Sequence, residues 1–163
     1  MSAYIVTSAS ISGDYRYRLG RAWAGGPTCT FIMLNPSTAD ADQDDPTIRR
    51  CVGFAKALGC GALEVVNLYA YRATNPRDLL RQDERVGPEN DYWLREAAQY
   101  AEAEGAPLIA AWGAHAEQWR TQQVLALPGM GRLAALGVTK DGHPRHPLYL
   151  PGSARPEPWG WAL

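Results

Sequence analysis

The chain has 163 residues, of which 46% are hydrophobic, so one domain over residues 1–163 with a substantial core is expected. Sixteen basic residues stand against 17 acidic ones, and this near-neutral balance argues against a protein that coats nucleic acid non-specifically. Three cysteines without a CxxC pair and the lack of a membrane-length apolar run predict a cytoplasmic protein with no disulfide framework, zinc ribbon or membrane partner.

The first two strands are expected near the N-terminus. Between the runs YIVTSASI and YRYRLGRAW stands Gly13-Asp14, a dipeptide typical of tight turns. In the second run aromatic and apolar side chains alternate with Arg16 and Arg18, which is the pattern of a half-exposed strand. We therefore expect an N-terminal antiparallel hairpin.

Apolar runs then alternate with helical patterns. Four strands are predicted in CTFIMLN, ALEVVNLYA, APLIAAWG and RLAALGVTK. Helices are predicted in DPTIRRCVGFAKALGCG, PENDYWLREAAQYAEAEG and AHAEQWRTQQVLAL, and the first should start with Asp45 as N-cap and Pro46 at its first position. This order predicts an α/β fold, a three-layer sandwich with a central, mostly parallel four-stranded sheet plus the N-terminal antiparallel hairpin.

Two segments lack a clear periodicity of hydrophobic residues. RATNPRDLLRQDERVGPEN is expected to be a loop with a short helical turn. The C-terminal segment from Asp141 has too many prolines for regular structure, and Trp159 and Trp161 are expected to pack this tail onto the domain.

Asparagines stand where two of the predicted strands end. Because the carboxyl ends of parallel strands meet at one edge of a sheet, Asn35, Asn67 and the pair Trp112-Gly113 are placed where α/β proteins carry chemistry. Asn35, fixed in front of Pro36, either terminates its strand or holds a water or a substrate edge. An unpaired amide in a buried strand costs about 1–3 kcal/mol, so Asn67 either finds a partner or reads a ligand.

An acidic loop and a histidine-proline segment are the other candidates. The segment that carries Asp40, Asp42, Asp44 and Asp45 lacks the glycine and the closing glutamate of a calcium-binding loop. A solvated loop with one helix cap is therefore favoured over a metal site, and a functional role for a single aspartate stays open. In GHPRHP the prolines prevent a helical pair of His143 and His146, and His115 is expected on a helix, so zinc is disfavoured. A histidine fixed on a loop is better suited to hydrogen-bonding a developing anion.

Four segments resemble, in this order, motifs of the uracil-DNA glycosylase superfamily: FIMLNPSTAD, LEVVNLYAYRA, LIAAWGAHAEQ and HPLYL. The first is similar to the opening motif of the mismatch-specific and thymine-DNA branch. The resemblance implies the fold of that superfamily. It also places Asn35 on the water-positioning asparagine, Asn67 on the base-reading asparagine and His146 on the histidine that faces the base. The chain departs from the motifs at three positions. Leu34 and Ser37 stand where the first motif has glycines before and after Asn-Pro, and Leu148 stands where the last motif has serine.

The whole chain also resembles a bacterial and phage family described as domain of unknown function 1643. Its hallmarks stand here as YRYRLGRAW, MLNPSTAD, DDPTIRRC, VVNLYAYRAT and GHPRHPLYL. That family brings no settled activity.

The glycosylase resemblance implies hydrolysis of an N-glycosidic bond that excises a damaged or modified base from DNA, with no cofactor. In this hypothesis Asn35 orients the water, His146 donates to the base and Asn67 pairs with its edge. Pro36 and Tyr69 would lie against the base, although for Tyr69 and Tyr71 packing beside the strand is favoured over stacking on a base. Phosphate contacts are expected from Ser37 and from arginines, namely Arg49, Arg50, Arg72 and Arg145.

Two alternatives stay open from the sequence. A non-catalytic module that binds a nucleotide or modified base would keep Asn67 and His146 as readers without needing a positioned water. A free-nucleoside hydrolase would act on monomers and ignore DNA. The expected partner is accordingly DNA, single- or double-stranded, or a nucleotide, and no obligatory protein partner is evident.

Overall fold

The computed structural model of the chain describes residues 4–159. Its strands are β1 (Val6–Ser12), β2 (Tyr15–Ala22), β3 (Thr28–Met33), β4 (Ala62–Asn67), β5 (Leu108–Ala110), β6 (Ala134–Ala135) and β7 (Glu157–Pro158). Its helices are α1 (Pro46–Ala57), α2 (Pro76–Leu80), α3 (Asn90–Glu104) and α4 (Gln118–Leu125), with 3₁₀ turns η1 (Met130–Arg132) and η2 (Pro147–Tyr149). None of the helices in this part of the chain has the length and apolar character needed to cross a membrane.

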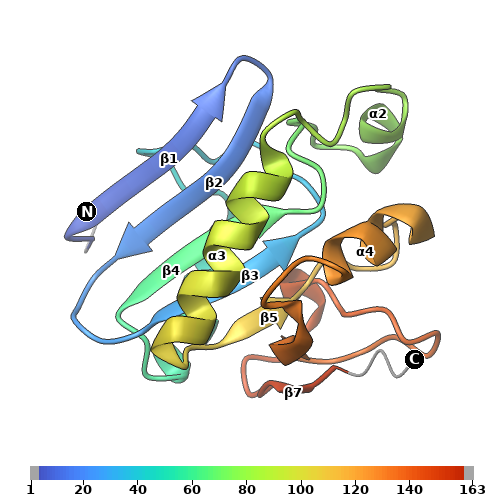
Figure 1. Cartoon of the computed structure of the whole chain (residues 1–163). Helices are drawn as coiled ribbons and strands as arrows, with labels where there is room; N and C mark the ends of the chain where they lie inside the picture. Colours follow the sequence, from blue (N-terminus) through green and yellow to red (C-terminus); the bar gives the residue numbers. More distant parts are fainter. Residues whose placement is uncertain (1–3, 160–163) are drawn as a thin grey trace.

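All seven strands form one mixed sheet in the order β1-β2-β4-β3-β5-β6-β7 (Figure 1). The four middle strands run parallel, and they contain the four strands predicted from the sequence. The expected count of four is nevertheless wrong, because β2 pairs antiparallel with β4 and β7 pairs antiparallel with β6. β1 and β2 therefore extend the same sheet, and their pairing satisfies the edge of β4.

Helices cover both faces of this sheet. Helix α1 packs with β3 and β4 in one apolar cluster, and helix α3, which crosses the sheet in Figure 1, packs on the opposite face in a second cluster. The predicted start of α1 is confirmed: the Asp45 side chain accepts a hydrogen bond from the nitrogen of Ile48 at 2.9 Å, and Pro46 is the first helical residue.

Helix α4 begins later than the sequence predicts. The chain turns at Gly113, whose φ of 77° lies in the left-handed region that glycine tolerates best. Residues 114–117 then run as a loop, and the helix starts only at Gln118. His115 is consequently an exposed loop residue, and its predicted place on a helix is wrong.

The C-terminal segment is mostly irregular, as predicted, but it also adds the short edge strand β7. Trp159 packs edge-on against Trp112, with ring centroids 5.2 Å apart. Trp161 lies outside the described residues.

A bulge in β2 changes the side-chain pattern predicted for that strand. Ser10 pairs with Arg18 and Ile11 pairs with Arg16, so Tyr17 has no partner of its own. The extra residue breaks the alternation, and the adjacent side chains of Arg16 and Tyr17 are both only 2% exposed. Arg16 is therefore buried, in contrast to the half-exposed pattern expected from the sequence.

Candidate functional site

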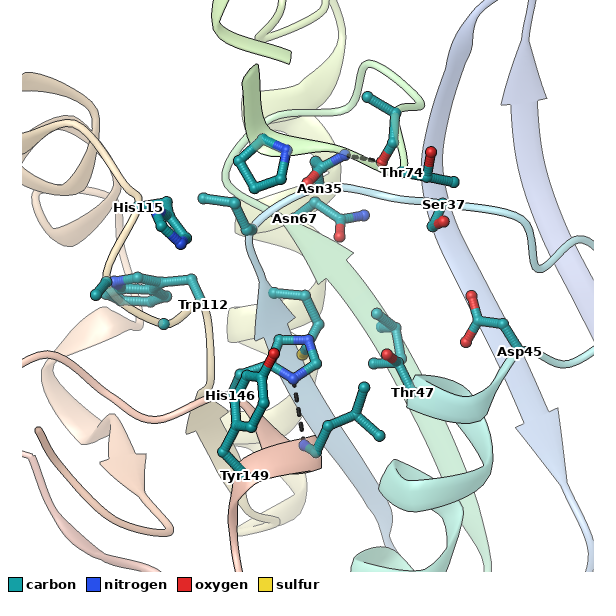
Figure 2. Close-up of a pocket in the computed structure, with 18 of the residues that line it drawn as sticks. Asn35, Ser37, Asp45, Thr47, Asn67, Thr74, Trp112, His115, His146 and Tyr149 are labelled. Carbon is teal, nitrogen blue, oxygen red and sulfur yellow. Dashed lines mark hydrogen bonds between the residues drawn. The ribbon is translucent and has the colours of Figure 1, made fainter. Parts of the chain in front are cut away.

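A cavity of about 660 Å³ lies at the carboxyl ends of β3, β4 and β5 (Figure 2). This is the edge of the sheet at which parallel α/β proteins commonly bind ligands. Its volume falls within the range of about 300–1,000 Å³ that is usual for small-molecule sites. The polar side chains in its wall include Arg16, Asn35, Asp45, Thr47, Asn67 and His146.

Asn67 is the last residue of β4 and lies in the wall of the cavity with 0% exposure. Neither its side-chain oxygen nor its side-chain nitrogen has a hydrogen-bond partner among the described residues. Each unsatisfied buried polar atom costs about 1–3 kcal/mol. The amide is therefore held in a position where a ligand with an adjacent donor and acceptor would satisfy it.

Asn35 borders the same cavity just beyond the end of β3. Its side-chain nitrogen donates to the backbone oxygens of Pro36 at 2.9 Å and Ala73 at 2.7 Å, which fixes the amide between two loops (Figure 2). The side-chain oxygen has no partner within residues 4–159. Asn35 thus offers the cavity an acceptor in a fixed orientation.

His146 reaches the cavity from the C-terminal segment, where it caps the short turn η2. Its Nδ1 accepts a hydrogen bond from the nitrogen of Leu148 at 3.2 Å, so the neutral ring carries its proton on Nε2 (Figure 2). Burial lowers the pKa of His146 from its ordinary value of 6.5, and the charge of Asp45 offsets part of this effect. The ring is therefore a neutral hydrogen-bond donor at neutral pH.

The first turn of α1 forms another part of the wall through Asp45 and Thr47. Asp45 is occupied as a cap, because its second carboxylate oxygen also accepts from the nitrogen of Ala39 at 3.4 Å. The amino end of this helix carries a partial positive charge.

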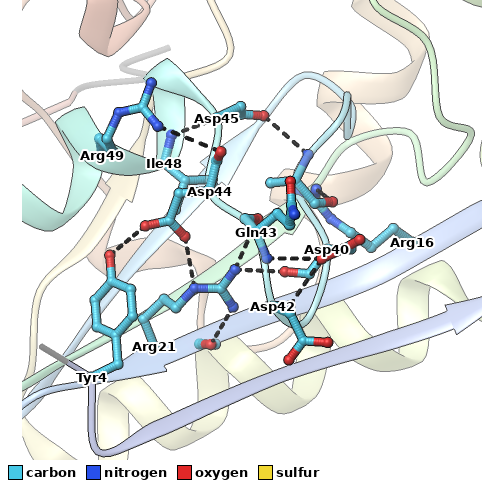
Figure 3. Close-up of polar contacts among 12 residues, drawn as sticks. Tyr4, Arg16, Arg21, Asp40, Asp42, Gln43, Asp44, Asp45, Ile48 and Arg49 are labelled. Carbon is cyan, nitrogen blue, oxygen red and sulfur yellow. Dashed lines mark hydrogen bonds and ion pairs between the residues drawn. The ribbon is translucent and has the colours of Figure 1, made fainter. Parts of the chain in front are cut away.

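The other aspartates of the acidic loop organise the loop itself (Figure 3). Asp40 accepts from the nitrogens of Asp42 and Gln43 at 2.9 and 2.8 Å, and these bonds lower its pKa. Asp44 pairs with the buried Arg21 at 2.8 Å. Nowhere in residues 4–159 do three or more histidine, cysteine or acidic side chains gather as metal ligands.

Tyr69 and Pro36 do not line the cavity. Tyr69 is fully buried on the other face of the sheet, where its hydroxyl donates to a carboxylate oxygen of Glu117 at 3.0 Å and accepts from the nitrogen of Glu117 at 3.1 Å. Pro36 is buried, and its oxygen accepts from the nitrogen of Ala73 at 3.0 Å. The structure therefore brings neither side chain to the place where the sequence expected a base.

Three of the predicted phosphate contacts line two hollows, whereas Arg49 and Arg50 line neither of them. Ser37 and Arg145 line the main cavity, whereas Arg72 lines a neighbouring hollow of about 380 Å³ that shares Ser37. Each predicted arginine donates to backbone oxygen: Arg72 to Ser37 and Ala39, Arg145 to Tyr149, Arg50 to Pro147 and Leu150, and Arg49 to Asp44. Their positions are thus set by the protein's own loops.

Three exposed side chains also line the cavity. Leu148 and Tyr149 line it from η2 and are 45% and 72% exposed. His115 lines it from the loop before α4 (Figure 2).

Arg16 is a residue of the cavity wall that the sequence pattern did not identify as functional. The alternation in YRYRLG predicts a partly exposed strand. The bulge that buries Arg16 cannot be predicted from the residue pattern of a single sequence. Thr47 was also missed, although its place in a first helical turn after a strand end is a usable signal.

A family model described as "Protein of unknown function (DUF1643)" matches residues 16–148. Because the match covers most of the chain, the chain belongs to this family. No curated protein and no solved structure matched the chain.

Proposed function

We propose that this member of the DUF1643 family hydrolyses an N-glycosidic bond and excises a damaged or modified base from DNA. The observation that carries the proposal is the fully buried amide of Asn67, which has no partner within the described residues and shares one cavity with Asn35 and His146. Three of the four sequence segments that resemble the uracil-DNA glycosylase superfamily supply these same three residues, in the same order.

The cavity suits a planar heterocycle. A base edge with a donor beside an acceptor would satisfy both orphaned atoms of Asn67 at once. Met33, Leu34 and Trp112 contribute apolar surface to the same wall, which favours a flat ring over a strongly hydrated group.

His146 would stabilise the departing base. Breaking the bond leaves negative charge on the base, and a neutral imidazole with its proton on Nε2 can donate to a base oxygen. The backbone hydrogen bond from Leu148 to Nδ1 holds the ring in the required tautomer. Removing one such fixed donor typically lowers the rate by about 10²–10³.

Asn35 would orient the attacking water. Because its nitrogen is held by two backbone oxygens, its side-chain oxygen is the atom left to accept a hydrogen bond from water. An amide is a poor general base, so the reaction would depend on the leaving group, and bases that leave readily would be favoured.

The test uses oligonucleotides that carry uracil, hypoxanthine, hydroxymethyluracil or bulkier modified bases, followed by alkaline cleavage of abasic sites. We expect strand breaks with at least one base, and about a 10²–10³-fold lower rate for Asn35→Ala. Gln122→Ala removes an exposed amide on α4, away from the cavity, and should leave the rate unchanged.

Two other outcomes would replace the proposal. Tight binding of a modified base without any release would identify a binding module. Release from free nucleosides but not from oligonucleotides would identify a nucleoside hydrolase, which needs no flipped base and so avoids a cost of a few kcal/mol.

A further inference from the structure

Arg16 is a buried cation in the wall of the cavity without a carboxylate partner. Its side chain is 2% exposed, and one terminal nitrogen donates to the oxygen of Ala39 at 2.7 Å. Its Nε has no acceptor, and no ion pair involves it among residues 4–159. Burial lowers the pKa of Arg16 to about 10, so the side chain stays charged at neutral pH.

The two other buried arginines each have a carboxylate partner. Arg21 pairs with Asp44 at 2.8 Å, and Arg120 pairs with Asp91 at 2.7 Å. Each of them also donates to backbone oxygens. Because an unpaired buried charge is costly, the exception at Arg16 calls for an anion that the protein itself does not provide.

Arg16 and Asn67 belong to neighbouring strands and line the same cavity. Leu19 of β2 pairs with Val65 of β4 in antiparallel sense, so the residues that precede Leu19 run beside the residues that follow Val65, toward Asn67. The bulge at Tyr17 is what places Arg16, rather than Tyr17, in this wall. Two side chains with unsatisfied donors thus line the same cavity.

We propose that Arg16 binds the anionic oxygen that the base develops as its glycosidic bond breaks. This inference rests on the proposed function. The bond between the anomeric carbon and the base nitrogen breaks, and its electron pair leaves with the base. Water adds to the anomeric carbon and loses a proton to solvent, and the base anion takes up a proton on release. Arg16 keeps its own proton throughout and acts only through charge and hydrogen bonding.

Several charged groups near Arg16 influence its pKa. Asp45 and Asp40 favour its charged form, whereas Arg72 and Arg21 oppose it. Asp45 forms no ion pair with Arg16, and its carboxylate accepts from the backbone nitrogens of Ile48 and Ala39.

The decisive experiment measures binding rather than cleavage. The probes are two pairs of free bases, 5-nitrouracil with uracil and xanthine with hypoxanthine, in which the first member ionises more readily. We expect the wild-type protein to bind the ionised member of at least one pair preferentially, detected by its ultraviolet spectrum. Arg16→Gln should lower the affinity for that anion about tenfold to hundredfold and change the affinity for its neutral partner much less.

Arg16→Lys and Arg16→Met serve as matched variants. Lysine keeps the charge and should retain part of the preference for the anion, whereas methionine should lose it. Because the charge of Arg16 has no carboxylate partner, Arg16→Met should unfold at about the same temperature as wild type or higher, which keeps a folding defect apart from lost binding. Equal anion affinity in wild type and Arg16→Gln, no preference for either anion, or no binding of any probe would overturn the inference.

Failure of this inference differs from failure of the proposed hydrolysis. An anion preference that depends on Arg16, without base release from any oligonucleotide, would retain the anion site and reject the reaction. Base release that Arg16→Gln slows equally for readily and poorly leaving bases would retain the reaction and reject the role of Arg16.

Discussion

The side-chain nitrogen of Asn90 donates to the backbone oxygen of Asn67 at 2.9 Å, so one buried asparagine fixes the main chain of another whose own amide has no partner. Asn90 also donates to the oxygen of Leu68 at 3.1 Å. The end of β4 is thereby held rigidly although the Asn67 amide destabilises it.

This contrast predicts opposite effects of two similar substitutions. Asn67→Leu removes two unsatisfied polar atoms and should raise the free energy of unfolding by about 1–3 kcal/mol while abolishing base binding and release. Asn90→Leu also removes one unsatisfied oxygen, but it leaves two buried backbone oxygens without this donor, so it should lower the free energy of unfolding by about 1 kcal/mol. Urea unfolding of both variants measures this, and destabilisation by Asn67→Leu would contradict a ligand-reading role.

The sequence predicts the edge of the sheet at which Asn35 and Asn67 lie, because strand ends in a parallel sheet follow from the order of strands and helices. It predicts the start of α1 equally well, since Asp45 and Pro46 act locally. Both predictions depend on short-range signals in the chain.

The remaining features depend on long-range packing. Arg16 enters the cavity because a bulge shifts the β2 register against β1, which only the paired strands reveal. Tyr69 lies two residues after Asn67, so strand alternation would put both side chains on one face. However, β4 ends at Asn67, and the chain then turns Tyr69 into the apolar cluster on the α3 face.

Tyr69→Leu tests this placement. The substitution removes a buried ring and its two hydrogen bonds with Glu117, so we expect the free energy of unfolding to fall by about 2–4 kcal/mol. At temperatures well below unfolding, the rate of base release and the affinity for free bases should match wild type. A selective loss of base affinity in the folded variant would contradict this placement and indicate that Tyr69 contacts the base.

The pair of Arg21 and Asp44 predicts a strong effect on stability. Asp44→Ala removes the only carboxylate paired with Arg21 in the described part of the chain and leaves a buried charge, which should cost about 3 kcal/mol (Figure 3). Asp42→Ala, in the same loop, removes an exposed carboxylate and should change stability by less than about 0.5 kcal/mol. Thermal unfolding of the two variants side by side is the measurement, and equal effects would contradict the pairing.

The lowered pKa of His146 predicts how stability changes with pH. In the unfolded chain this histidine takes up a proton near its ordinary pKa of 6.5, whereas in the folded protein burial delays protonation to a lower pH. Between these two values the unfolded state binds more protons, so the contribution of His146 to stability is complete above 6.5 and is lost as the pH falls through the folded pKa.

Nuclear magnetic resonance titration of the three histidines should show His146 protonating below 6.5. His146→Asn should flatten the fall of the unfolding free energy with decreasing pH over the same window. Gln122→Ala, which changes an exposed amide that does not titrate, should keep the wild-type slope. Protonation would also place a hydrogen on Nδ1, opposite the nitrogen of Leu148, and would break the contact that fixes the ring. Base release should therefore decline with acid at the pKa of His146, and a profile unchanged in His146→Asn would contradict its role as the donor.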